Sequence, residues 1–145
     1  MINLDTTIAD TQSLIRIDSQ NPGVQEGVCA EWVGNRLAGM GLNVAVQTVE
    51  GERRNLIATI PGSGSSPRLV LLSHLDTVPI GVGWTLPPLE GVIKDDRIYG
   101  RGACDMKGGM AVALGLLESL VRTGVEVRGD VVFVATVDEE APDMA

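Results

Sequence analysis

The stretch KGGMAVALGLLESLVRTGVEVRGDVVFVATV, residues 107–137, carries the strongest signal for the fold class. Its first half, residues 107–121, places apolar side chains at helical spacing and predicts a helix that packs on a sheet. Its second half ends in the continuous apolar run of residues 130–137, and LVLL at residues 69–72 is a similar run. Strands of this kind are typical of a parallel sheet covered by helices on both faces. The sequence therefore predicts an α/β fold, a three-layer sandwich with a mostly parallel mixed sheet between helices.

Shorter patterns complete the expected fold. Apolar residues at helical spacing predict two amphipathic helices near the N-terminus, the first ending at NPG (residues 21–23) and the second at Gly41. Three β-type runs follow, at residues 43–49, 55–60 and 68–74. The loop PGSGSSP joins the last two runs, which are expected to form a hairpin. This loop lacks the Lys and Ser/Thr of a P-loop, so it does not predict a phosphate site.

The composition narrows the class of protein. With 145 residues, 44% of them hydrophobic, the chain is long enough for one domain with a buried core. A formal charge of −8 and an aromatic content of 3% argue against nucleic acid as a partner. Cys29 and Cys104 are far apart, which disfavours a disulfide or a thiolate zinc site. No segment has the pattern of a signal peptide or a membrane span, so we expect a soluble, cytoplasmic protein.

The single histidine lies where an apolar run ends, in SHLDTVP (residues 73–79). Side chains two apart on a strand point the same way, so His74 and Asp76 can meet. An aspartate that accepts a hydrogen bond from one ring nitrogen leaves the other nitrogen free to bind a metal. Because HxD alone is a short motif, an exposed histidine with an acidic neighbour stays open as an alternative. Ser73 faces the other side of the strand and the chain has no GxSxG motif, which argues against a serine nucleophile.

Two further acidic elements follow a strand or precede a helix. Asp105, in YGRGACDMKGGM, comes just before the buried helix, either as its N-cap or as a ligand. Glu139 and Glu140 end the last apolar strand, and if one of them bound a metal the other could act as a general base. Ligand sites in α/β sheets lie beyond the carboxyl ends of the strands. We therefore expect these residues to converge with the histidine and aspartate of SHLDTVP in one cleft.

Taken in order, SHLDTVP, DDRIYGRGACDMKGGMA and VDEE resemble the M20 family of metallopeptidases and amidohydrolases. That family includes acetylornithine deacetylases, succinyl-diaminopimelate desuccinylases, aminoacylases and glutamate carboxypeptidases, and the resemblance spans nearly the whole chain. It implies a hydrolase with two divalent metal ions that cleaves an amide or peptide bond next to a free carboxylate. The implied metal is zinc, although carboxylate and imidazole ligands also suit cobalt or manganese. The implied substrate is an N-acyl amino acid or short peptide, and the implied full-length form is a homodimer.

The resemblance also implies a role for each candidate residue. His74 is implied as a ligand of one metal ion and Glu140 as a ligand of the other, with Asp105 bridging both. Asp76 is implied to orient the histidine. Glu139 is implied to be the general base that acts on the attacking water.

The chain departs from the family pattern in length. Family members are much longer, so residues 1–145 are expected to be the N-terminal part of the catalytic domain, without the inserted dimerisation domain and the C-terminal half. APDMA at residues 141–145 lacks the glycine that usually follows the glutamate pair. We therefore expect a fragment or truncated chain that alone binds metal weakly and does not turn over substrate. The resemblance further implies a cis peptide bond between Asp105 and Met106.

Two other hypotheses stay open. The chain could be a non-catalytic remnant that acts as a binding or interaction module, and loss of both zinc binding and amidase activity would favour this. An unrelated nucleotide-binding α/β domain ranks last, because the chain has no GxGxxG or Walker sequence.

Overall fold

The computed structural model describes residues 1–22, 25–64 and 66–140. The elements in chain order are α1 (Leu4–Arg16), α2 (Glu26–Gly39), β1 (Val44–Glu50), β2 (Arg53–Ile60), β3 (Leu69–His74), β4 (Val92–Lys94), β5 (Arg97–Tyr99), the short irregular turn η1 (Ala103–Lys107), α3 (Gly108–Thr123) and β6 (Val131–Thr136). Every helix and strand that the sequence patterns predict is present, with ends that differ by a few residues.

Each helix buries one apolar stripe. In α3, Met110, Leu114 and Leu117 are fully buried, as their spacing predicts. Val121, predicted on the same stripe, is 39% exposed because it lies in the last turn of the helix. Among the helices of the described residues, none is long and apolar enough to cross a bilayer.

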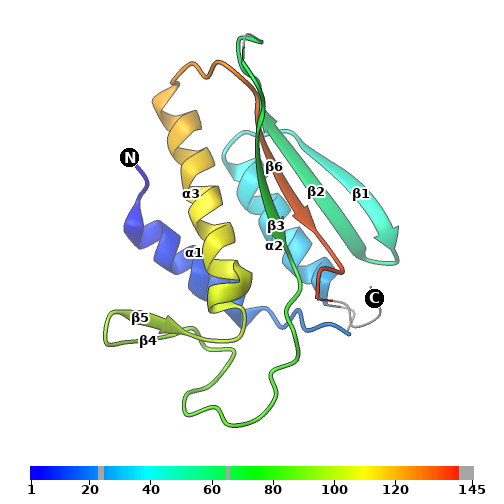
Figure 1. The fold of residues 1–145 in the computed structure, drawn as a ribbon, viewed down its shortest axis with the longest axis vertical. Helices are drawn as coiled ribbons and strands as arrows, with labels where there is room; N and C mark the ends of the chain where they lie inside the picture. The colour runs from blue at the N-terminus through cyan, green and yellow to red at the C-terminus, as the bar shows by residue number, and fades with distance from the viewer. Residues whose placement is uncertain (23–24, 65, 141–145) are drawn as a thin grey trace.

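Four strands form one mixed sheet in the order β1, β2, β6, β3 (Figure 1). β3 pairs with β6 in parallel, whereas β2 pairs antiparallel with both β1 and β6. The α/β class and the mixed sheet are confirmed. Parallel pairing is less extensive than expected within the described residues. A parallel pair needs a long crossover, and α3 supplies one only between β3 and β6.

The expected hairpin between residues 55–60 and 68–74 is wrong, because β6 lies between β2 and β3. β6 has no exposed side chain and pairs along both of its edges, which satisfies its backbone groups on either side. The loop after β2 instead crosses the start of β6. There the backbone N–H of Gly62 donates to Oδ1 of Asp130 over 3.0 Å. A Cβ at Gly62 would lie 2.4 Å from the backbone of Gly129, so the crossing requires glycine.

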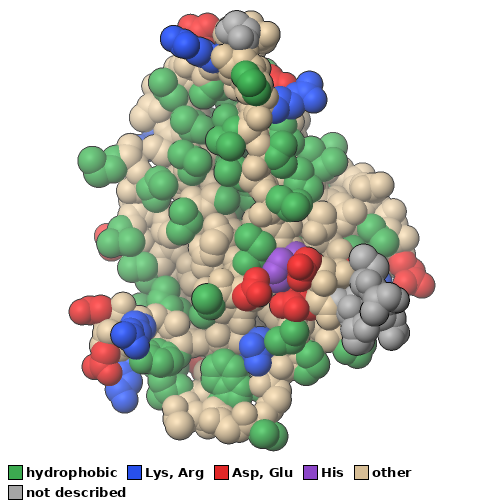
Figure 2. Space-filling view, in the orientation of Figure 1, with side chains coloured by type: hydrophobic (Ala, Val, Ile, Leu, Met, Phe, Trp, Pro, Cys, Tyr) green, Lys and Arg blue, Asp and Glu red, His purple; other side chains and the backbone are tan. Residues whose placement is uncertain are grey.

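Within the described residues, the helices cover one face of the sheet (Figure 1). Phe133 of β6 and Leu56 of β2 are buried against them. Side chains that point to the other face, Ile57, Val70 and Leu72, are 37%, 54% and 64% exposed. Figure 2 shows apolar side chains gathered over this face. The second helical layer of the expected sandwich is therefore not part of the described residues.

Residues 92–99 form a second, two-stranded sheet that no pattern above predicts. β4 and β5 pair antiparallel, and the turn between them consists of Asp95 and Asp96, whose φ angles are 50° and 57°. Aspartate tolerates this left-handed conformation better than most residues do. The two consecutive aspartates between short β-type runs were the available signal for this hairpin.

The parallel pairing of β3 with β6 positions the candidate site. His74, the last residue of β3, lies opposite Thr136, the last residue of β6. The chain segments that follow the two strands therefore leave the sheet at the same edge. The turn η1 also contacts β3, which brings Asp105 to that edge. This is the end of the sheet where α/β proteins usually bind ligands.

Candidate metal centre

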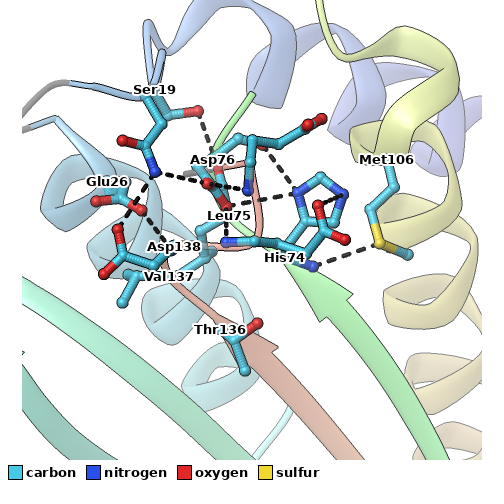
Figure 3. Close-up of polar contacts among 12 residues, drawn as sticks. Ser19, Glu26, His74, Leu75, Asp76, Met106, Thr136, Val137 and Asp138 are labelled. Atoms are coloured by element: carbon cyan, nitrogen blue, oxygen red, sulfur yellow. Dashed lines mark hydrogen bonds and ion pairs between the residues drawn. The ribbon is translucent and has the colours of Figure 1, made fainter. Parts of the chain in front are cut away.

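His74 is held by its neighbours on one side and faces acidic side chains on the other. Its side chain is 7% exposed, and Nδ1 lies 3.0 Å from the backbone carbonyl oxygen of Asp76 and 3.5 Å from Oδ1 of that residue. The backbone N–H of His74 contacts the sulfur of Met106 at 3.3 Å (Figure 3). Nε2 is directed at Asp105. Contact with Asp76 therefore occupies one ring nitrogen and leaves the other for a ligand.

Asp76 is fully buried and connects β3 to the loop after β6. Its Oδ1 accepts the backbone N–H of Glu139 at 3.3 Å, and its Oδ2 accepts that of Glu140 at 2.9 Å. Oδ2 also accepts a hydrogen bond from Nδ2 of Asn21 at 3.0 Å. Burial acts to raise the pKa of Asp76, but hydrogen bonds from His74 and Asn21 outweigh it and lower that pKa to about 2. Asp76 thus stays ionised and fixes the glutamate loop, as well as contacting the histidine.

Three more carboxylates surround Nε2 of His74. Asp105 Oδ1 lies 3.1 Å from this nitrogen, and Glu139 Oε2 lies 3.9 Å from it. One ligand atom each of His74, Glu139 and Glu140 all lie within 4.8 Å of one another. The side chains of Asp105 and Glu139 are 77% and 58% exposed. The structure therefore brings the five predicted residues together, on an open surface at the edge of the sheet, where Figure 2 shows the histidine among acidic side chains.

Asp105 does not cap α3. The helix begins at Gly108, and its N-cap residue Lys107 makes no side-chain capping bond. Asp105 instead has extended backbone angles and points at His74. Its peptide bond to Met106 is cis, which confirms the expectation. Of the two roles left open for Asp105, the structure supports that of a residue aimed into the cluster.

The segment around Asp105 is anchored by a buried lysine and shaped by glycines. Lys107 is 1% exposed, and its Nζ donates to the carbonyl oxygens of Leu14 and Ile17 at the end of α1 over 2.8 Å and 2.7 Å. Gly102 has a φ of +81°, and a Cβ at Gly108 would lie 2.5 Å from the oxygen of Ala103. The glycines that flank Asp105 in the sequence are therefore required by the tight path of the backbone.

The electrostatics of the cluster favour a cation. Contact with the Asp76 carboxylate outweighs burial and raises the pKa of His74 to about 9, and Asp105 adds to this effect. Partial burial raises the pKa of Glu140; His74 opposes this shift, while Asp105 and Glu139 add to it. An imidazole and several carboxylates within reach of one point are a donor set that divalent zinc accepts. The residues present therefore fit a divalent metal ion.

Sequence patterns do not predict the residues that support the glutamate loop. Asn21, Glu26 and Arg53 all contact Asp138, which has a φ of 67°. One signal was available for Glu26. It lies on the stripe of α2 that contains Cys29 and Val33, and a glutamate on an apolar stripe needs a buried partner.

In the metal-free protein, the imidazole of His74 is expected to titrate near pH 9 rather than at its ordinary pKa of 6.5. Because the folded-state pKa is the higher one, the protonated ring stabilises the fold fully below pH 6.5, and this contribution is lost as the pH rises through about 9. NMR of the ring measures this value without ambiguity, because the chain has one histidine. A ring that titrates at or below 6.5 would contradict the contacts described for it.

Comparisons with known proteins find relatives over most of this chain. The sequence profile of the peptidase family M20/M25/M40 matches residues 70–144. Succinyl-diaminopimelate desuccinylase of Gluconacetobacter diazotrophicus is 39% identical over 90% of this chain and 34% of its own length. The same enzyme of Methylorubrum extorquens is 40% identical over 93% of this chain and 36% of its own. The chain therefore spans about a third of the length of the curated relatives it matches.

Solved structures of peptidases have a similar fold. A tripeptidase from Staphylococcus aureus superposes with a TM-score of 0.76 at 28% identity, over 97% of this chain and 38% of its own. An M20 family metallo-carboxypeptidase from Sulfolobus solfataricus gives a TM-score of 0.83 at 22% identity, over 94% of this chain and 32% of its own, which concerns the fold alone. The profile match covers the strands, turns and acidic loop that build the cluster. This chain belongs to the peptidase family M20/M25/M40.

Proposed function

We propose that this chain carries part of the active site of a metal-dependent hydrolase that cleaves an amide or peptide bond next to a free carboxylate. The observation that supports the proposal most strongly is the cluster of His74, Asp105, Glu139 and Glu140 at the carboxyl ends of β3 and β6. Its relatives that are named desuccinylases and its neighbour that is named a tripeptidase fit the same reaction class.

The proposed metal ligands are His74 through Nε2, Glu140, and Asp105 between two metal ions. Two divalent cations, zinc first and cobalt or manganese as alternatives, would lower the pKa of the attacking water and polarise the scissile carbonyl. Asp76 keeps His74 in the orientation that presents Nε2, because it occupies the side of the ring that carries Nδ1. It also holds the backbone N–H groups of the two glutamates.

Glu139 is the proposed general base. It accepts a proton from the attacking water and returns it to the leaving amine, so the same carboxylate acts in both halves of the reaction. Its exposed side chain leaves it free to reach a substrate at the open edge of the sheet. The neighbouring Glu140 is less exposed, which suits a ligand better than a proton carrier.

The same proposal covers the domains, oligomeric state, location, substrate and partners of the whole protein. Residues 1–145 form the N-terminal part of the catalytic domain, and a dimerisation domain and the C-terminal half belong to a longer, homodimeric, cytoplasmic enzyme. The substrate is an N-acyl amino acid or a short peptide. Nucleic acid and membranes are not partners, in keeping with the charge of −8.

The test uses the protein expressed from its intact gene, loaded with zinc. Hydrolysis is measured on N-succinyl-diaminopimelate, an N-acetyl amino acid and a dipeptide, before and after removal of metal with a chelator. We expect hydrolysis of at least one of these amides, its loss on chelation and its return when zinc is added. A protein that neither binds zinc nor hydrolyses any of them would contradict the proposal and favour a non-catalytic binding module.

A further inference from the structure

The loop that carries Glu139 and Glu140 is held at Asp138 by the ion pair of Glu26 and Arg53. Glu26, at the start of α2, is completely buried, and its Oε1 accepts the backbone N–H of Asp138 at 3.0 Å (Figure 3). Arg53, at the start of β2, donates both to Glu26 and to the carboxylate of Asp138. Glu26 and Arg53 come from elements far apart in the sequence, yet both bind the residue directly before Glu139.

Asp138 has a backbone conformation that needs such support. Its φ of 67° lies in the left-handed region, which aspartate tolerates better than most residues but which still costs more than it does for glycine. The Glu26 carboxylate fixes its N–H, and Arg53 and Asn21 fix its side chain. Because the angle at Asp138 sets the direction in which the chain continues, these contacts act together with the bonds from Asp76 to the backbone N–H groups of Glu139 and Glu140 to set where those two side chains point.

The carboxylate of the pair is buried, whereas its guanidinium is partly exposed. The side chain of Glu26 is 1% exposed and that of Arg53 is 16% exposed. A buried carboxylate without its cation is strongly disfavoured, so Glu26 requires Arg53. Neither residue contacts the ligand atoms of the cluster, so their contacts reach the site through Asp138 and the loop, while their charges also interact with Asp76.

We propose that Glu26 and Arg53 are positioning residues that set the direction of Glu139 and Glu140 toward His74. The proposal rests on the function proposed above, because it assigns the pair a role in metal binding and turnover. A positioning role and a purely structural role predict different effects of substitution. A structural ion pair changes stability, whereas a positioning pair also changes the geometry and metal affinity of the cluster in protein that remains folded.

The test compares Glu26→Gln, Arg53→Met and the double variant in the protein expressed from its intact gene. A matched control is Asp10→Asn, which removes one partner of Arg36 in another half-buried ion pair, between α1 and α2 and away from the site. Three quantities are measured: amide hydrogen exchange at Glu139 and Glu140 in metal-free protein, zinc affinity, and kcat and KM separately. Melting temperatures identify the loss of stability in each variant.

Both single variants are expected to speed amide exchange at the two glutamates. They are also expected to lower zinc affinity about 10–100-fold, the usual effect of removing a residue that supports a metal ligand without binding the metal itself. The double variant is expected to lose no more than the worse single variant, since the two residues act as one unit. We expect kcat to fall while KM stays within about twofold. Asp10→Asn is expected to lower the melting temperature without these changes.

Wild-type amide exchange and zinc affinity in folded Glu26→Gln and Arg53→Met would overturn the proposal, as would equal effects in Asp10→Asn. If Arg53→Met does not fold, Arg53→Lys, which keeps the charge but not the two-pronged donor, replaces it. A wild-type protein that binds no zinc would contradict the proposed function instead. The exchange measurement in metal-free protein then still decides whether the pair orders the loop.

Discussion

Asp105→Ala is expected to abolish tight zinc binding and leave the fold intact. Its carboxylate is the proposed bridge between two metal ions, so its removal takes one ligand from each ion at once. The loss of zinc affinity is expected to exceed the roughly 10–100-fold loss that follows when a residue that only supports a metal ligand is removed. The side chain of Asp105 is 77% exposed and the residue does not cap α3, so the substitution removes little that stabilises the protein.

The measurement is calorimetric titration with zinc, together with a melting curve. Asp5→Ala is the matched control, because Asp5 is an exposed carboxylate in the first turn of α1, distant in sequence from every candidate ligand. This control is expected to bind zinc as the wild type does. Wild-type affinity in Asp105→Ala would remove Asp105 from the metal centre. A melting temperature far below that of the control would mean that the residue serves the fold.

Glu139→Gln is expected to lower kcat by about 10²–10⁴-fold, the usual contribution of a general base, with zinc stoichiometry unchanged. Glutamine keeps the size and shape of the side chain but cannot accept the proton. The adjacent change Glu140→Gln is expected to act differently, because it removes a proposed ligand and therefore lowers zinc affinity.

This pair of variants decides a question that the geometry leaves open. Glu139 and Glu140 each place an oxygen within 4.8 Å of the same His74 nitrogen and of each other, so distance does not assign their roles. Zinc titration and kcat are measured for both variants side by side. If Glu139→Gln lost zinc and Glu140→Gln lost only turnover, the two roles would have to be exchanged.

The elements with strong local signals could be predicted from the sequence. The helical stripe of α3 and the apolar run of β6 are long and regular, so their type was unambiguous. The spacing of His74 and Asp76 at a strand end indicated that they could meet, and they do, although β3 ends at His74 and the chain bends at Leu75, so the contact forms across the bend and not along the strand. Beyond these local patterns, the role of each acidic residue came from the resemblance to a family.

Features that depend on distant parts of the chain could not be predicted. The position of β6 between β2 and β3 is a choice of sheet topology, and the loop after β2 carries the same turn residues in either arrangement. The contacts of Glu26 and Arg53 with Asp138 join three elements that are distant in sequence. A glutamate on the apolar stripe of α2 indicated a buried partner, but nothing in its neighbourhood named Arg53.

The central claim is that His74, Asp105, Glu139 and Glu140 form a metal centre. Anomalous diffraction at the zinc absorption edge, from crystals of the protein expressed from its intact gene and loaded with zinc, tests it most directly. We expect two zinc peaks, one beside Nε2 of His74 and one beside the carboxylate of Glu140, with Asp105 between them. Zinc bound elsewhere, for example on the exposed thiol of Cys104, with nothing at His74, would contradict the claim.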